Sequence, residues 1–209
     1  LDPAQAIGPF GVLDVGFSPA FAADQVMVAV VTDGAQTVVR TKVGSSAWGA
    51  GISDAVIKDY DGNDFASDRA HIAFPSDYSA SGSEYMTSLF VGISADDGTG
   101  DPLGDVFRID GKFPPEPSTV TDLNVRGEVS STDPTETNIW DIAVSGEAAG
   151  ATILVGTEET DPLALPDPPG QFLVYASEDA GAGWVPSAGT VSSCKQPTKD
   201  SGASVGMTD

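Results

Sequence analysis

The chain has 209 residues and carries 31 acidic against 9 basic side chains, which gives a net charge of −22 at pH 7. An electrostatic field of this sign repels phosphate backbones and anionic lipid headgroups, so it disfavours nucleic-acid and membrane-surface binding. No run of 18 apolar residues occurs, and the sequence therefore predicts no membrane-spanning helix.

Short apolar runs separated by turn residues dominate the sequence. The 24 glycines and 15 prolines interrupt helical patterns, whereas segments rich in Val, Ile, Phe and Thr recur along the chain. This pattern predicts an all-β fold. The segments predicted as strands are 12–19, 26–32, 37–44, 54–60, 70–77, 88–94, 105–111, 118–125, 138–145, 151–157, 172–179 and 183–191.

These segments form three copies of a four-strand unit. The second strands of the three copies align on Val28, Val91 and Val155, which lie 63 and 64 residues apart. The same alignment places Arg40 and Arg108 at equivalent positions of the third strands. Repeated groups of four short strands are typical of β-propeller blades, and we expect a propeller segment of about three four-stranded antiparallel blades.

The expected blades cover residues 10–62, 63–130 and 131–193, with residues 194–209 as a tail or the start of a further blade. Closed propellers contain about four to eight blades. The chain also begins with Leu1 and shows no targeting pattern ahead of its first strand. We therefore expect a segment of a longer protein, or one that partner chains complete. A β-sandwich of about twelve short strands is the alternative architecture.

The most specific local motif is Ser177-x-Asp179-x-Gly181-x-x-Trp184, which follows the third strand of the third copy. It resembles the Asp box of the BNR-repeat β-propellers, a family that includes sialidases and many non-enzymatic surface proteins. The motif is structural: the Asp accepts turn hydrogen bonds, the Gly takes a positive φ and the Trp acts as an apolar peg. A degenerate copy at residues 41–48 keeps only the first Thr and the Trp.

The resemblance implies a fold rather than a reaction. A sialidase would need three arginines around the substrate carboxylate and a Tyr/Glu nucleophile pair. The chain holds only four arginines: Arg40, Arg69, Arg108 and Arg126. No catalytic motif of the family matches its residues, so we assign no catalytic residue.

Metal and nucleophile chemistry have few candidates. His71 is the single histidine and Cys194 the single cysteine, which excludes multi-histidine and all-cysteine metal sites. The acidic loops leave calcium as the one cofactor to consider, because this hard cation prefers several oxygen ligands on a flexible loop. The first candidate site comprises Asp59, Asp61, Asn63 and Asp64, and a weaker one comprises Asp96, Asp97 and Asp101.

Together these features predict a non-catalytic, extracellular propeller module that serves as a cell-surface, surface-layer, adhesion or assembly component. Its expected partners are other copies of the chain, surface proteins or glycans. A sialidase-like glycoside hydrolase fragment and a carbohydrate-binding module are the alternatives.

Overall fold

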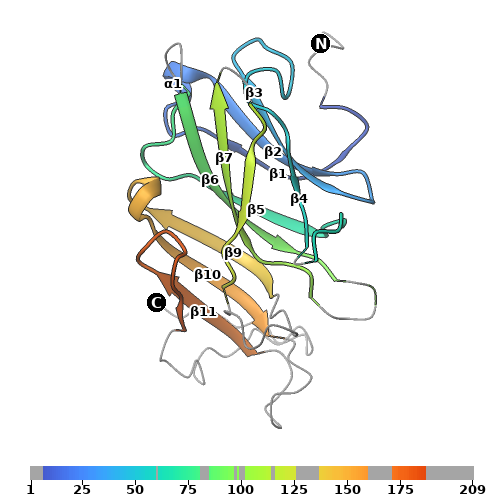
Figure 1. The fold of residues 1–209 in the computed structure, drawn as a ribbon, viewed down its shortest axis with the longest axis vertical. Coiled ribbons are helices and arrows are strands. Elements are labelled where there is room, and N and C mark those ends of the chain that lie inside the picture. The colour runs from blue at the N-terminus through green and yellow to red at the C-terminus, as the bar shows by residue number, and fades with distance from the viewer. Residues whose placement is uncertain are drawn as a thin grey trace, which may run out of the picture.

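A computed structural model describes residues 7–59, 61–80, 85–96, 98, 102–113, 116–125, 137–159 and 171–186. The described strands form three four-stranded antiparallel sheets (Figure 1). The first sheet contains β1 (Gly11–Phe17), β2 (Val26–Thr32), β3 (Thr37–Val43) and β4 (Ala55–Ile57). The second contains β5 (Arg69–Ala73), β6 (Tyr85–Ser94), β7 (Val106–Phe113) and β8 (Thr119–Asp122). The third contains β9 (Asn138–Ser145), β10 (Thr152–Glu159), β11 (Gln171–Ser177) and β12 (Val185–Pro186).

The prediction of an all-β chain is confirmed, and every predicted segment overlaps one of these strands. The strands are divided among three sheets, whereas a sandwich would divide them between two. Among the described residues, two single turns of helix lie between the strands, α1 (Phe21–Asp24) and the 3-10 turn η2 (Ala148–Gly150). Neither helix within the described part of the chain has the length and apolar character that spanning a bilayer requires.

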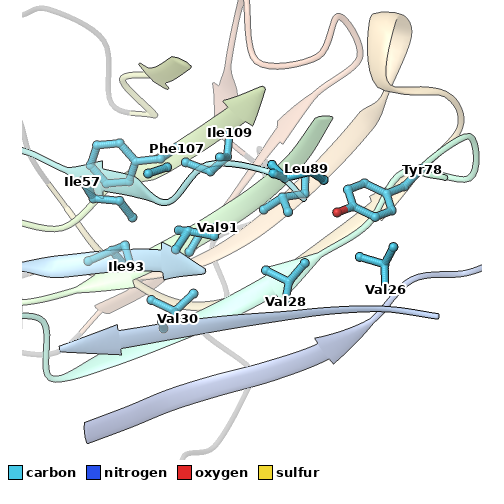
Figure 2. Close-up of a cluster of buried hydrophobic side chains, with 14 of the residues drawn as sticks. Val26, Val28, Val30, Ile57, Tyr78, Leu89, Val91, Ile93, Phe107 and Ile109 are labelled. Carbon is cyan, nitrogen blue, oxygen red and sulfur yellow. The ribbon is translucent and has the colours of Figure 1, made fainter. Parts of the chain in front are cut away.

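The three sheets pack face against face in chain order. The first strands are neighbours, because β5 contacts both β1 and β9. One apolar cluster fills the interface between the first and second sheets, and Figure 2 shows Val26, Val28 and Val30 directed from β2 toward Val91 of β6. A second cluster, which includes Phe90 of the second sheet, fills the next interface.

The structure corrects the register of the repeat. Val28 and Val91 were aligned as equivalent, but they face each other across the interface between the first and second sheets. Val155 faces the second sheet, in the same sense that Val91 faces the first. A shift of one residue moves a side chain to the opposite face of a strand, so the residue equivalent to Val91 and Val155 is Ala29, which lies on the far face of the first sheet.

The same shift separates two of the arginines. Arg40 is paired with Ala29, whereas Arg108 is paired with Phe90, which belongs to the cluster between the second and third sheets. Their side chains therefore lie on opposite faces of their sheets, and the predicted equivalence of these two positions is wrong.

A β-bulge recurs in the first strands of the first and third sheets. In β1 the register shifts between Val12 and Asp14. In β9 it shifts immediately before Asp141, opposite Gly156 and Thr157 of β10. Each bulge is followed by an aspartate whose Oδ1 accepts a hydrogen bond from the next backbone N–H, at 2.8 Å for Asp14 and 2.9 Å for Asp141.

Asp14 also joins two sheets. Its Oδ2 accepts a hydrogen bond of 2.7 Å from the backbone N–H of Ile72 in β5. Because β5 is an edge strand, alternate N–H groups point away from its own sheet and need a partner elsewhere. Asp14 supplies that partner, and the bond fixes the first strands of the first two sheets against each other.

We predict that Asp14→Ala lowers the free energy of unfolding by about 1–3 kcal/mol, because it leaves the Ile72 N–H without its acceptor. Asp141→Ala is the matched control, since Asp141 makes only the local bond to Ile142 among the described residues, and its cost should be below about 0.5 kcal/mol. Urea unfolding at low protein concentration measures both values. Equal stability of the two variants would show that the Asp14 bond contributes nothing.

Candidate functional site

The hairpin between β11 and β12 is held by hydrogen bonds among its own side chains and amides. Ser177, which is only 1% exposed, donates its hydroxyl to Asp179 Oδ1 at 2.8 Å and accepts the Gly181 N–H at 2.8 Å. Asp179 Oδ1 also accepts the Gly183 N–H at 2.9 Å. The carboxylate and the hydroxyl thus satisfy the amides of a turn that has no strand partner.

Gly181 is required for two reasons. Its φ of +91° lies in the left-handed region that L side chains rarely adopt. A Cβ at this position would also lie 2.5 Å from Leu123 Cδ1, in the segment that follows β8. The hairpin therefore approaches the second sheet at a point where only glycine fits.

Trp184 fastens the hairpin to the neighbouring sheet. Its indole Nε1 donates a hydrogen bond of 2.8 Å to the carbonyl oxygen of Leu123. The ring packs against the apolar cluster between the second and third sheets. Ser177, Asp179, Gly181 and Trp184 are thus brought together in one element, which links the third sheet to the second.

The degenerate motif of the first copy places its tryptophan on the corresponding face. Trp48 packs with Ile7 and Phe10 against Ala29 and Val31, on the face of the first sheet that points away from the second. Both tryptophans therefore pack on the face of their own sheet that is directed toward the preceding part of the chain. Trp184 meets a preceding sheet there, whereas Trp48 meets the N-terminal segment.

An open groove of about 790 Å³ lies beside the hairpin, between the second and third sheets. The second sheet contributes Arg108 and Asp110 of β7 together with the end of β8 and residues 123–125, and the third contributes Tyr175 and residues 179–184. The groove combines aromatic and charged side chains from two sheets, and we take it as the candidate binding site.

The carboxyl groups of the groove differ in their proton affinity. Burial raises the pKa of Asp122 above its ordinary value of 3.8, against the opposing effect of the Asn124 N–H that the carboxylate accepts. The hydrogen bonds from Ser177 and from the Gly183 amide lower the pKa of Asp179 below the same value. Environments that separate the pKa values of neighbouring acids are common at binding and catalytic sites.

Arg108 is the one cation among the described residues that line the groove, and it is already paired. Arg108 Nε lies 2.9 Å from Asp110 Oδ1, and its Nη2 donates to Ser88 Oγ at 3.2 Å. The pair is about 30% exposed, so a ligand can reach it from the groove. A planar guanidinium fixed by a carboxylate can donate its remaining N–H groups to hydroxyl or carboxylate oxygens of a ligand.

The other described arginines do not converge on this groove. Arg40 Nε pairs with Asp54 at 3.0 Å on the far face of the first sheet. The guanidinium of Arg69 stacks 3.9 Å from the ring centre of Trp140. The three described arginines are therefore engaged at separate places, and Arg126 lies outside the described residues.

His71 lies in β5, with a buried Nε2 that has no hydrogen-bond partner among the described residues. Cys194 lies outside the described residues.

The loop proposed to bind calcium is a tight turn closed by its own polar groups. Asp59 accepts hydrogen bonds from the backbone and side-chain nitrogens of Asn63, and Asp64 pairs with Lys58 at 2.7 Å. Among the described residues, no hydrogen bond or ion pair joins Asp61 to them. Within the described ranges, no three His, Cys, Asp or Glu side chains lie close enough together to hold a metal ion. Calcium binding here remains a prediction from the sequence.

In the weaker acidic cluster, Asp96 accepts the Gly98 N–H at 2.7 Å. Asp97 and Asp101 lie outside the described residues.

The groove was not predicted from the sequence, because its walls come from segments about sixty residues apart. Asp14 was also missed, although a signal for it exists. The segments LDVGFS (13–18) and WDIAVS (140–145) match in their aspartate, in the alternation that follows and in their final serine. Aligning the first strands instead of the second would have given the correct register.

Comparisons with protein-family models, with curated protein sequences and with solved structures find no match for this chain.

We predict opposite pH effects for two isosteric variants of the groove. Folding raises the pKa of Asp122, so ionisation above about pH 4 costs stability, and Asp122→Asn should melt at a higher temperature than the parent at pH 7. Folding lowers the pKa of Asp179, so its ionised form stabilises the fold above the unfolded pKa, and Asp179→Asn should melt at a lower temperature at pH 7.

Both differences should shrink as the pH falls toward 3, because both parent side chains become protonated: Asp122 first in the folded state, Asp179 first in the unfolded state. Calorimetry at the two pH values measures them. Shifts of the same sign for both variants at pH 7 would contradict this assignment of the two carboxyls.

Proposed function

We propose that the chain is a segment of a β-propeller and acts as a non-catalytic, extracellular binding module of a cell surface, surface layer or adhesion assembly. The observation that carries this proposal is the order of the sheets. Three consecutive four-stranded antiparallel sheets pack face to face with their first strands adjacent, which is the arrangement of successive blades around a propeller axis.

The hairpin at residues 177–184 supports the same proposal. It joins the third and fourth strands of its sheet, and its tryptophan packs on the preceding sheet. The Asp box occupies that place in the family that the sequence resembles. The motif therefore acts in holding two sheets together, and we assign it no reaction.

The charge and the arginines favour binding over catalysis. A net charge of −22 with nine basic residues suits a protein that must stay soluble in a crowded, salty exterior. A carboxylate-binding arginine triad needs its members around one point, whereas Arg40, Arg69 and Arg108 each have a separate partner.

The location can be tested in cells that produce the protein. A membrane-impermeant amine-reactive biotin reagent should label the chain on intact cells, because a surface module presents exposed lysines such as Lys58 to the medium. A cytosolic protein of known location serves as the unlabelled control. Recovery of the chain only from the cytosol, unlabelled, would contradict the proposed location.

Glycan binding in the groove is the second candidate function. Tyr175 and Trp184 offer aromatic surface next to Arg108 and Asp122, a combination that suits the apolar face and the hydroxyl groups of a sugar ring. The same surface could also belong to a hydrolase fragment, and measured turnover distinguishes the two.

We expect that a glycan array bound by the parent chain loses its signal with Arg108→Gln and keeps it with Arg40→Gln. Both arginines pair with an aspartate, at 2.9 and 3.0 Å, but only Arg108 lines the groove. Fluorogenic glycosides, sialosides included, should be bound without turnover. Hydrolysis that Asp122→Asn abolishes would favour the glycoside hydrolase instead, and equal loss in both arginine variants would exclude the groove.

A further inference from the structure

Most of the exposed large apolar side chains lie toward the two ends of the stack of sheets. Among the side chains that the structure describes, they belong to β1, to the turn after it or to the third sheet: Val12, Val15, Phe17, Phe21, Trp140, Leu154, Val174 and Val185. Trp140 is the exception to this placement, because it stacks with Arg69 of the second sheet. Apolar surface gathered in this way marks an interaction site more often than scattered exposure does.

The open face of the third sheet repeats a face that is covered twice elsewhere in the chain. In the corrected register, Leu154 is equivalent to Val28 and Phe90. The next sheet covers Val28 and Phe90 completely, whereas Leu154 is 47% exposed. The chain therefore builds the same apolar face three times and covers it with its own described residues only twice.

The glycines of this face give the same result. A Cβ on Gly92 would lie 2.5 Å from Ile139 Cγ2 of the third sheet. At the equivalent Gly156, no atom of the described structure would lie within 4 Å of such a Cβ. A residue that allows close approach of a neighbouring sheet is thus present at a position where the described chain provides no neighbour.

The bulged aspartates extend the comparison to a specific polar contact. Asp14 uses Oδ1 for its local bond and Oδ2 for the edge N–H of Ile72 in the next sheet. Asp141 makes the same local bond through Oδ1, and its exposed side chain presents Oδ2 on the open face. Asp141 is therefore placed to accept an edge N–H from a further first strand.

The complementary half of this interface is present at the other end of the stack. Val15 and Phe17 of β1 are equivalent to Ile72 and Phe74, the residues that meet Asp14 and Gly16 in the first interface. They are 48% and 56% exposed, and β1 is an edge strand of its sheet. The N-terminal segment and Trp48 cover the same face only over β2 and β3.

We infer that the open face of the third sheet binds the first sheet of a second copy of this chain, head to tail. The β1 strand of that copy lies along β9, as β5 lies along β1 in the first interface. Asp141 accepts one of its edge N–H groups. A head-to-tail pair still has one uncovered first-sheet face and one uncovered third-sheet face. Further contacts of the same kind therefore either close into a ring or extend into a filament.

The net charge makes this association dependent on salt. Two copies with −22 each repel one another, and the Debye length falls from about 10 Å at 0.1 M to about 3 Å at 1 M ionic strength. Association through apolar faces should therefore strengthen with salt, whereas a contact driven by ion pairs would weaken.

Sedimentation velocity of the full chain at about 0.1 M and about 1 M NaCl tests the inference. We expect the mass of a dimer or larger species, populated more at high salt. A chain that is monomeric at high protein concentration in both salts would overturn it, because its open faces would then belong to some other partner.

Two variants test the head-to-tail geometry. Val15→Asp alters only the β1 end, and Leu154→Asp alters only the third-sheet end. Each should bind itself at least about tenfold more weakly than the parent chain does. An equimolar mixture retains one intact face on each variant and should form a 1:1 dimer that grows no further. Self-association of either variant at the parent level, or a mixture that stays monomeric, would contradict the inference.

Controls separate charge and folding from contact. Ala35→Asp adds the same charge on the exposed turn between β2 and β3, outside β1 and the third sheet, and should associate like the parent. Both altered side chains are about half exposed, so circular dichroism and melting temperature should match the parent. Asp141→Ala should weaken association without lowering the stability of the single chain. If it leaves association unchanged, the aspartate is not part of the contact.

Discussion

Burial of one sheet face under the next is the interaction on which the rest of the structure depends. The described sheets have no long helix to cover them, so each apolar face must find another sheet. Val28 and Val91 are fully buried only because they face each other, and each valine that leaves water in this way contributes about 1.5–3 kcal/mol. Contacts between first strands, such as the bond from Ile72 to Asp14, fix how the two faces meet.

The strands could be predicted because their limits are encoded locally. Glycine, proline and aspartate mark the turns, and each apolar run between them is too short for anything but a strand. Which face of a strand is buried against the next sheet is not encoded locally in the same way. VMVAVVT is apolar at six of its seven positions, so its two faces look alike, and only contact with the second sheet distinguishes Val28 from Ala29.

The candidate site likewise has one part that the local sequence encodes, the hairpin, and one part that it does not, the groove. The residues of the hairpin are neighbours in sequence, and the hydrogen bonds of Ser177 and Asp179 follow from their side chains and the spacing of the glycines. The groove beside it exists only because the hairpin of one sheet reaches the end of another. Leu123 shows this dependence: its carbonyl oxygen accepts a hydrogen bond from Trp184, and its side chain would have to move to admit a residue larger than glycine at position 181. Nothing near Leu123 in the sequence indicates either role.

A stack of sheets has two ends, and repeat proteins commonly cover theirs with polar caps to remain soluble. In this chain the first sheet has a partial cap of Ile7, Phe10 and Trp48, whereas Leu154 and Val174 of the third sheet are exposed. A large negative charge gives another means of keeping such ends apart, because it opposes association over roughly one Debye length and loses that effect as salt rises. The acidic composition and the open apolar face can therefore act together. The charge keeps single copies soluble, and the apolar face determines which surfaces meet when ions screen the repulsion.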